Sequence, residues 1–327
     1  MFQKVIDAIQ NGRSPYLFTA IEGDRIGQIA VKDGDDVFGD AAIIPQLDPN
    51  DVLPQLYGGV FCERITTPPH LILCGAGHVS VYTARIAKMV GFAVTVIDER
   101  EEFANRDRFP DADRIVNLPF AEALAAICDP NAYYVIVTRG HQHDRNCLET
   151  ILKKPYTYLG MIGSHSKIEV VYEYLRLNGY TDEQLKSVHA PIGLPIGAQT
   201  PEEIAVCIVG EMIEVKNRSR RGCEWDAALC EAIRSATEPY AMVTLIDKKG
   251  SAPRAAGARM IVFQDGRIVS SIGGGFGEFE AAAHAKRMLR DGSKQKRYSC
   301  YMNNREAASK GMICGGEIDV FIQIVEV

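Results

Sequence analysis

The feature that most constrains the fold of this 327-residue chain is a pair of glycines directly after a short apolar run. Leu71–Cys74 is typical of a buried strand, and the apolar spacing over 79–90 is typical of a helix. Gly75-x-Gly77 lies between them, and a second apolar strand over 93–97 ends at Asp98. This order of strand, glycine turn, helix, strand and acidic residue predicts a dinucleotide-binding βαβ unit.

Each part of this motif has a physical role in nucleotide binding. Gly75 permits the tight turn, and Gly77 lets the backbone approach a pyrophosphate at the helix N-terminus. Ser80 stands where a third glycine is usual, which affects helix–strand packing more than phosphate contact. NAD and NADP both stay open, and the fold can also persist as a scaffold without nucleotide. The predicted nucleotide-binding residues are Gly75, Gly77, His78, Asp98 and Arg100, the last of which can meet a 2′-phosphate.

Strands continue to alternate with helices after this unit. Apolar runs at 133–137 and 156–162 predict two more buried strands, and Thr200-Pro201-Glu202-Glu203 predicts a helix start with a capping box. The alternation favours a parallel α/β sheet. We therefore expect a Rossmann-like domain over 69–217, bounded by tandem prolines and by a basic linker near 216–222.

The last hundred residues have a different character. We expect a smaller α+β module over 222–327. Its predicted helices are 225–236 and 277–290, and its predicted strands are 240–246, 259–263, 267–272 and 318–324.

The first 68 residues partly repeat this module, which predicts a degenerate copy of it over 1–68. The N-terminal copy lacks the glycine clusters and the cysteine of the C-terminal one, so we expect a structural remnant of a duplication. The proposed correspondences are 14–19 with 238–243, 35–39 with 265–269 and 58–63 with 315–320.

Two loops that follow predicted strands carry side chains suited to chemistry. His141 and His143 in the first loop can be an acid/base set or metal ligands, and Asp144 can instead cap the following helix. Lys167 in the second loop is placed for an anionic group. Because ligands of open α/β sheets bind at the carboxyl ends of the strands, we expect both loops to face the nucleotide crevice. The loop 191–198, rich in proline and glycine, is expected to shape the rim of the pocket.

Three glycine-bearing segments, 250–254, 272–278 and 311–316, distinguish the C-terminal module. Successive glycine amides can converge on an anion, and the second segment opens a helix, whose N-terminus favours negative charge. Arg254 can clamp a phosphate, and Glu278 can accept hydrogen bonds from a heterocycle. Cys314 can bind a soft metal or carry sulfur. The alternative interpretation is that these segments are ordinary tight turns.

Composition limits the class of partner and the compartment. A formal net charge of −6 excludes the electrostatic footprint of a nucleic-acid or anionic-lipid binder, which favours a small molecule or another protein. Nine cysteines without a CxxC pair indicate reduced thiols rather than a disulfide framework. The N-terminus lacks signal-peptide features and no window resembles a membrane span, so we expect a cytoplasmic protein.

In combination, these motifs resemble the XdhC/CoxI family, the xanthine dehydrogenase accessory factors. The resemblance covers nearly all of 58–327, but here the intact cysteine-bearing module follows the Rossmann domain, whereas in the family it usually precedes it. The matching motifs are Gly-Ala-Gly-His-Val at 75–79, Asp-Glu-Arg at 98–100, Arg-Phe-Pro-Asp-Ala-Asp at 108–113, Gly-Met-Ile-Gly-Ser at 160–164, the segment 191–205 and the three C-terminal glycine segments.

The resemblance implies a chaperone that binds the molybdenum cofactor and assists its sulfuration, protection and insertion into a xanthine dehydrogenase-type hydroxylase. The implied partners are the apo-hydroxylase and a sulfur donor protein, and a homodimer is the default assembly. Cys314 would be either a molybdenum ligand or a sulfur carrier. The implied cofactor-binding residues are Ser251, Arg254, Gly273, Gly274, Gly275, Glu278 and Cys314.

Two alternatives stay open on the residues alone. The first is an NAD(P)-dependent oxidoreductase in which His141 or His143 is the acid/base and Lys167 anchors the substrate. The second is an adaptor with vestigial sites that brings a sulfur donor and an apo-hydroxylase together.

Overall fold

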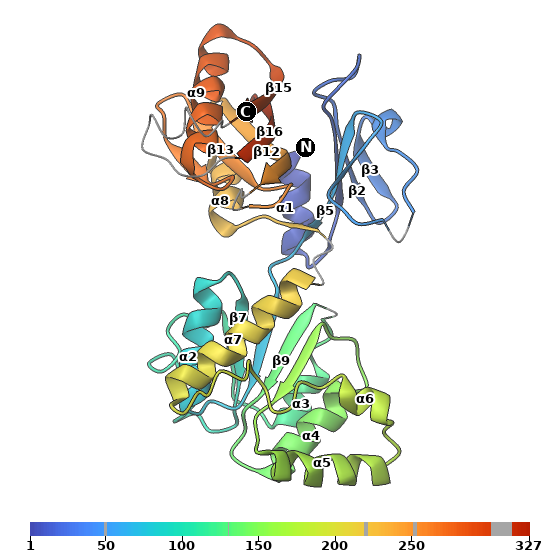
Figure 1. Cartoon of the computed structure of the whole chain (residues 1–327), viewed down its shortest axis with the longest axis vertical. Helices are drawn as coiled ribbons and strands as arrows, with labels where there is room; N and C mark the ends of the chain where they lie inside the picture. The colour runs from blue at the N-terminus through green and yellow to red at the C-terminus, as the bar shows by residue number, and fades with distance from the viewer. Residues whose placement is uncertain (49–50, 130, 219–221, 251–253, 302–315) are drawn as a thin grey trace. The chain divides into compact units, whose positions relative to one another are not determined.

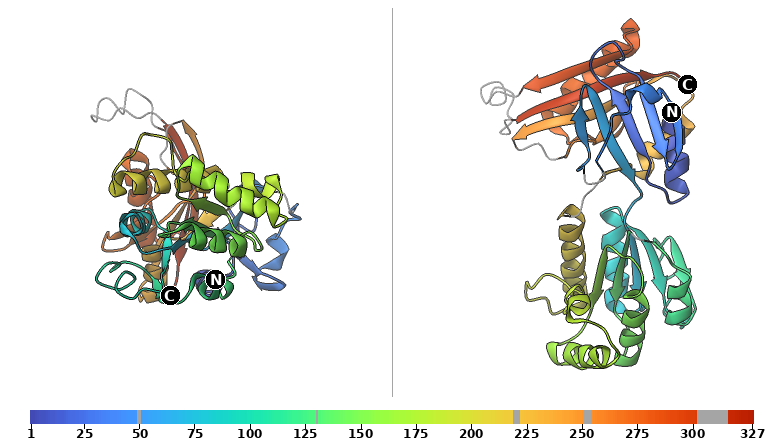
Figure 2. Two further views of the ribbon diagram at one scale, coloured as in Figure 1. Left: turned by 90° about the horizontal axis from the view of Figure 1, so that it is seen from below. Right: turned by 90° about the vertical axis from the view of Figure 1, so that its right-hand side faces the viewer.

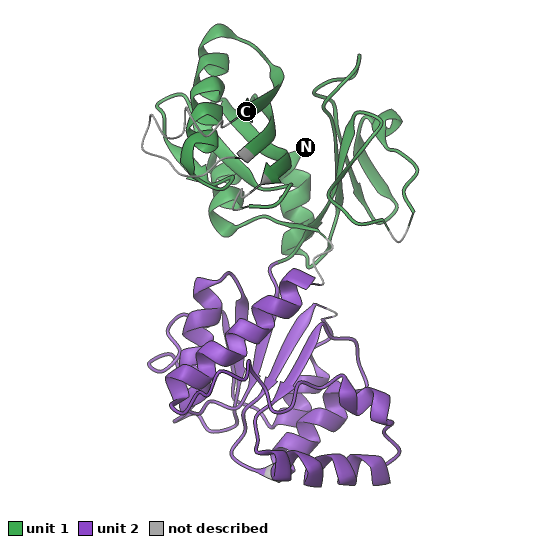
Figure 3. Ribbon diagram, viewed as in Figure 1, with its two compact units in different colours: residues 1–67, 221–327 green, residues 68–220 purple. Residues whose placement is uncertain are grey.

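The computed structural model describes residues 1–48, 51–129, 131–218, 222–250, 254–301 and 316–327 (Figure 1). The chain divides into two compact units (Figure 3). One, here called the Rossmann unit, is Pro68–Arg220, and the other, here called the flanking unit, joins Met1–Thr67 to Arg221–Val327. The N-terminal and C-terminal modules that the sequence suggests therefore belong to one compact unit.

The Rossmann unit is built on the parallel sheet that the sequence predicts. In the described residues the sheet has five strands in the order β10-β9-β6-β7-β8, and all neighbours run parallel. The strand order reverses between β6 and β9, which is where open α/β sheets bind ligands. The strands are β6 (His70–Cys74), β7 (Ala93–Ile97), β8 (Arg114–Val116), β9 (Ala132–Ile136) and β10 (Tyr158–Met161).

Helices cover both faces of this sheet (Figures 1 and 2). Helices α2 (His78–Met89) and α7 (Pro201–Arg218) pack on one face, and α3 (Phe120–Ala125), α4 (His141–Ile151) and α5 (His165–Leu177) pack on the other. A short helix α6 (Asp182–Lys186) follows. Burial on both faces explains why the strands are continuous apolar runs rather than alternating ones.

The predicted capping box at the start of α7 is confirmed. The Glu203 amide donates to Thr200 Oγ1 at 3.3 Å, and the Thr200 amide donates to Glu203 Oε2 at 3.2 Å. These reciprocal bonds satisfy two amides that a helix start would otherwise leave unpaired.

Among the described residues, the flanking unit contains two sheets with the same core topology, antiparallel throughout except for the short parallel pairing of β11 with β5. The sheet order β5-β1-β2-β3 in the N-terminal module matches β16-β12-β13-β14 in the C-terminal module, and a helix precedes the first strand of each. The N-terminal elements are α1 (Phe2–Gln10), β1 (Tyr16–Ala20), β2 (Ile29–Asp33), β3 (Asp36–Gly39), the 3₁₀ helix η1 (Ala41–Ile43), β4 (Gln55–Tyr57) and β5 (Val60–Thr66). The C-terminal elements are β11 (Cys223–Glu224), α8 (Ala227–Ser235), β12 (Tyr240–Gly250), β13 (Arg259–Phe263), β14 (Ile268–Ser270), α9 (Gly275–Asp291), β15 (Gln295–Tyr301) and β16 (Gly316–Val325).

The register of the repeat differs from the correspondences that the sequence suggests. Leu17 and its partner Val31 lie in the same buried cluster as Met242 and its partner Ile261, so Leu17 corresponds to Met242 rather than to Ala241. The predicted match of 58–63 with 315–320 is also shifted, because Leu17 pairs with Glu63 whereas Met242 pairs with Gln323. A one-residue shift moves every side chain to the other face of a sheet, which apolar runs alone do not resolve.

The two modules share one core and one buried ion pair. The shared cluster includes Phe2 of α1 and Trp225, whose ring centroids are 5.9 Å apart. Glu63 on β5 meets Arg259 on β13, and their side chains are 0% and 2% exposed. Arg259 Nη1 donates to Glu63 Oε1 at 2.9 Å, Nη2 donates to Oε2, and the guanidinium lies 5.2 Å from the Trp225 ring. This bidentate pair joins the modules in the middle of apolar surroundings.

Breaking this pair is expected to destabilise the flanking unit strongly. Glu63→Ala leaves the Arg259 charge buried and unpaired, which should lower the free energy of unfolding by about 3–5 kcal/mol. The double variant Glu63→Leu/Arg259→Met should recover most of that loss, because no charge is then buried alone. Trp225, the single tryptophan of the chain, contacts the pair and makes fluorescence during urea unfolding the direct measurement.

Arg25→Ala, which removes the exposed pair with Asp40 in the same unit, is the control and should cost less than about 1 kcal/mol. A Glu63→Ala variant that unfolds at the wild-type urea concentration would contradict the role given to the pair.

Candidate functional site

The candidate site of the Rossmann unit lies at the carboxyl ends of β6 and β9, where the glycine turn meets the end of β9. Gly75 has a φ of +114°, and a Cβ there would lie 2.5 Å from the carbonyl oxygen of Val137. Only glycine fits this turn. Ser80 is fully buried and donates to the Gly75 carbonyl at 2.6 Å, so it fixes the turn in place of a third glycine. Gly77 is the N-cap of α2, and a Cβ there would have nothing within 4 Å, which leaves its backbone open to a ligand.

Asp98, the predicted ribose partner, is engaged by the protein itself. It is 2% exposed, accepts the Ala76 amide at 3.0 Å, and binds the Arg100 guanidinium through Nε at 2.9 Å and Nη2 at 2.8 Å. Burial raises the pKa of Asp98, but the hydrogen bonds from Arg100 and Ala76 outweigh it and hold the pKa below its ordinary value. Arg100 also lies 4.0 Å from the Phe103 ring. A ribose at this position would have to compete with Arg100 for the carboxylate.

The loops after β9 and β10 meet through a second internal ion pair. Asp144 is fully buried in the first turn of α4, where it accepts Thr138 Oγ1 at 2.6 Å and pairs with Lys167 Nζ at 2.6 Å. The N-cap of α4 is Gly140, so Asp144 links two loops rather than capping the helix. Lys167, which the sequence places for an anionic group, therefore has the carboxylate of Asp144 as its partner, and its role toward a ligand stays a prediction.

The two candidate histidines have different surroundings. His143 packs against Phe120, with ring centroids 5.6 Å apart, and forms part of the wall between α3 and α4. His141 begins α4, and its side chain lies outside the described residues. Their acid/base role stays a prediction. Among the described residues, no group of three or more His, Cys, Asp or Glu side chains could hold a metal ion.

A half-buried polar network beneath the loop 191–198 was not predicted. Glu211 of α7 accepts the Tyr158 hydroxyl at 2.5 Å and the Gly193 amide at 2.9 Å, and pairs with His189 Nδ1 at 3.0 Å. Burial raises the pKa of Glu211, but the bonds from His189, Tyr158 and Gly193 lower it below its ordinary value. The sequence signal that could have revealed this network is Glu211 itself, a carboxylate that lies among the apolar residues that α7 buries.

In the C-terminal module, the glycine turn before α9 folds around a side chain of that helix. Glu278 Oε2 accepts Ser271 Oγ at 2.6 Å, the Ile272 amide at 2.9 Å and the Gly274 amide at 3.0 Å. Burial raises the pKa of Glu278, but these bonds lower it below its ordinary value, so the group stays ionised. The predicted cluster of amides around an anion therefore forms, and the anion is Glu278 itself.

The outer side of this turn is open. Gly274 and Gly275 have φ values of +75° and +70°, and a Cβ on either would meet nothing within 4 Å. Their backbone can therefore approach a ligand closely. Gly273 belongs to the same turn, with a φ of +135°. Arg254 is exposed in the same module, whereas Ser251 and Cys314 lie outside the described residues.

The Glu211 network should make the stability of the Rossmann unit depend on pH. Because the folded pKa of Glu211 lies below its unfolded value, its contribution is present above about pH 4.3 and is lost as the pH falls through the folded pKa. Glu211→Gln should therefore cost about 1.5–3 kcal/mol at pH 7 and progressively less on acidification. Urea unfolding followed by far-UV circular dichroism measures this difference.

Glu214→Gln, which removes an exposed carboxylate paired with Arg218 on the same helix, is the matched control and should show no such trend. A Glu211→Gln deficit that is equal at pH 7 and at acidic pH would show that the charge is not what stabilises the loop.

Comparisons with known proteins identify related chains. The curated relatives include a probable xanthine dehydrogenase component of Bacillus subtilis (strain 168), which is 33% identical over 161 residues, 49% of this chain and 46% of that protein. They also include the uncharacterized protein YqeB of Escherichia coli (strain K12), which is 34% identical over 155 residues, 47% of this chain and 28% of that protein. The chain thus spans less than half the length of these two relatives.

A solved structure is similar in both sequence and fold. The crystal structure of a xanthine dehydrogenase from Bacillus halodurans matches with a TM-score of 0.55 and 26% sequence identity. The match covers 67% of this chain and 64% of that one.

Family models match both units. Residues 71–212 match the XdhC Rossmann domain, and residues 233–299 match the model of the XdhC and CoxI family. The resemblance drawn from the glycine motifs is thereby confirmed, and the chain belongs to the XdhC/CoxI family.

Proposed function

We propose that this protein is an accessory factor of a xanthine dehydrogenase-type molybdenum hydroxylase, which binds the molybdenum cofactor and assists its sulfuration, protection and insertion. The observation that carries the proposal is the open glycine turn at 273–275, held by Glu278 at the start of α9 in the XdhC/CoxI-type module. The names of the Bacillus subtilis and Bacillus halodurans relatives support the choice of hydroxylase.

The turn suits the heterocycle of this cofactor better than its phosphate. Glu278 already places a negative charge among the amides, which disfavours a second anion at the same point. Its Oε1 takes none of the three bonds made to Oε2, so it can accept N–H donors from a pterin ring. Gly274 and Gly275 leave room for the ring to approach the backbone.

The other groups of the cofactor would need different residues. Arg254, exposed in the same module, is the candidate for the phosphate. Ser251 and Cys314 keep their proposed roles from the family resemblance, Cys314 as a molybdenum ligand or sulfur carrier. When bound, the cofactor supplies the redox-active metal that the client enzyme uses, so this chain needs to bind and release rather than to catalyse.

The proposed partners follow from the same function. They are the apo-hydroxylase that receives the cofactor and a protein that donates sulfur, in the cytoplasm, with this chain as a homodimer. In the described residues no helix is both long and apolar enough to cross a membrane. The oxidoreductase alternative stays a prediction, and the pairing of Lys167 with Asp144 gives it no added support.

Cofactor released anaerobically from a molybdenum hydroxylase should bind the purified full chain. Retention on ultrafiltration, with bound molybdenum measured by mass spectrometry and bound pterin by fluorescence after oxidation, gives the affinity. Glu278→Gln should weaken pterin retention by about tenfold, because the turn loses its charged acceptor. Glu280→Gln, a carboxylate of the same helix that makes none of these hydrogen bonds to the turn, should bind like wild type.

Failure of the wild-type chain to retain either molybdenum or pterin would overturn the proposed function. Cys314→Ala separates the two roles of the module. Retention of pterin with loss of molybdenum would support a metal or sulfur role for Cys314, and full retention of both would remove that role alone.

A further inference from the structure

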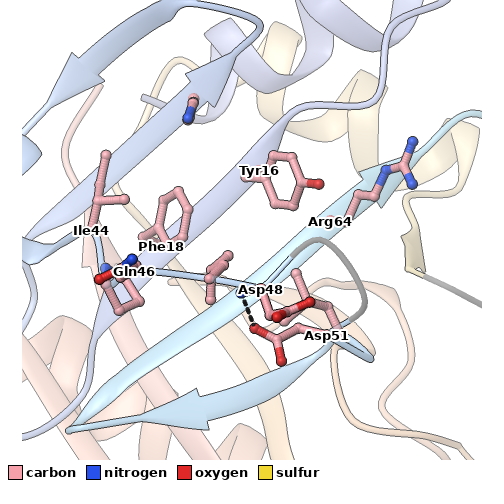
Figure 4. A pocket seen from close by; sticks show the side chains of 11 residues that line it. Tyr16, Phe18, Ile44, Gln46, Asp48, Asp51 and Arg64 are labelled. Carbon is pink, nitrogen blue, oxygen red and sulfur yellow. Dashed lines mark hydrogen bonds between the residues drawn. The ribbon is translucent and has the colours of Figure 1, made fainter.

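The N-terminal module contains a pocket of about 450 Å³ (Figure 4). Its floor is the face of the N-terminal sheet that points away from the core shared with the C-terminal module, since Phe18 faces the pocket whereas Leu17 belongs to that core. The wall is the segment that follows η1, including Ile44, Asp48 and Asp51.

The same face of the C-terminal sheet is covered by a helix. There α9 packs Ala281, Ala285 and Met288 onto Ala241 and Val262. In the N-terminal module, the described residues between β3 and β5 form only η1 and the short strand β4, so no long helix closes this face. Instead, η1 and the segment that follows it pack Ile43 and Leu53 onto this face, and the pocket is the space that they leave.

The side chains that face this pocket differ in chemistry from those at the corresponding positions of the C-terminal module. Tyr16 pairs directly with Lys32 on one side and Arg64 on the other, so the three form a row across the sheet. The corresponding row in the C-terminal module is Ala241, Val262 and Ile324. The three positions that are apolar beneath α9 in the C-terminal module therefore carry an aromatic ring between two cations in the N-terminal module.

Exposure to water accounts for Lys32, which is exposed, but not for Arg64, which is half-buried. Arg64 makes no salt bridge within the described residues. The Nε of Arg64 is buried and has no hydrogen-bond partner there. A buried N–H donor without an acceptor is costly, and an anion that enters the pocket would satisfy it.

The remaining lining suits a flat ring. Tyr16 and Phe18 are stacked, with their ring planes 14° apart and their centroids 6.3 Å apart, and Leu47 and Leu53 add apolar surface. Asp51, which accepts the Asp48 amide at 2.7 Å, brings carboxylate oxygens to the opposite wall. The volume lies within the usual range of small-molecule sites, roughly 300–1,000 Å³.

We propose that this pocket binds a flat aromatic molecule that carries a phosphate or carboxylate group. The ring lies against Tyr16, and the anionic group is held by Lys32 and Arg64. The site is separate from the glycine turn of the C-terminal module and does not depend on the proposed function of that turn.

Phenyl phosphate is the minimal probe, since it combines a ring and a dianion, and AMP is the larger one. Saturation-transfer NMR and calorimetric titration of the full chain should show saturable binding with a dissociation constant of about 1 mM or lower. Inorganic phosphate and phenol, each lacking one half of the probe, should bind at least about tenfold more weakly.

Lys32→Gln and Arg64→Gln should each weaken phenyl phosphate binding by about tenfold. Arg25→Gln is the matched control, because it removes the same charge from an exposed position of the same module. A urea unfolding curve, followed by Trp225 fluorescence, that matches the curve of the wild type would establish that the variants are folded.

Three results would overturn the proposal. They are the absence of saturable binding to wild type, equal loss in Arg25→Gln, which would indicate general electrostatic attraction, and full binding by both pocket variants, which would place the probe elsewhere, for example in the Rossmann crevice.

Discussion

The buried pair of Glu63 and Arg259 is the interaction on which the flanking unit depends, because it joins residues 196 positions apart in the chain. The Rossmann unit is inserted between them, and β11 pairs in parallel with the end of β5, so the chain leaves and re-enters the flanking unit at adjacent strands. A buried ion pair is compatible with a stable fold only while both charges and the hydrogen bonds between them are in place. The N-terminal copy therefore does more than persist as a remnant, since it supplies the carboxylate and part of the core that the C-terminal copy needs.

The same physical requirement recurs at the loops where ligands were expected. Asp98 holds Arg100 and the glycine turn, Asp144 holds Lys167, and Glu278 holds the turn at 272–274. In each case a carboxylate of the chain satisfies amides or a cation that would otherwise lack a partner. The loops are thereby ordered before any ligand arrives. A ligand can then bind to the open backbone of Gly77, Gly274 and Gly275 without the cost of ordering the loop.

The two copies in the flanking unit differ mainly in what covers their outer faces. Helix α9 closes the C-terminal sheet and presents the glycine turn at its N-terminus, whereas the N-terminal sheet is covered by η1 and the segment after it, which leaves a pocket beside Tyr16, Lys32 and Arg64. One topology thus yields two surfaces of different chemistry, and each carries its own proposed ligand. The stability of both surfaces is coupled, because the two sheets share the core that contains Phe2 and Trp225.

The glycine motif at 75–77, the parallel sheet around it, the capping box at Thr200 and the family were all accessible from the sequence. These features are local: a turn, a helix cap or an apolar run is encoded within a few residues of itself. The partners of Glu63, Glu211 and Glu278, and the register of the repeat, were decided only by the tertiary structure. Nothing in the sequence next to a carboxylate says which distant amide or cation it will contact. Because side chains alternate between the two faces of a strand, an apolar run does not fix the register of the repeat to within one residue. The register is fixed only when the tertiary structure buries the two faces against different partners.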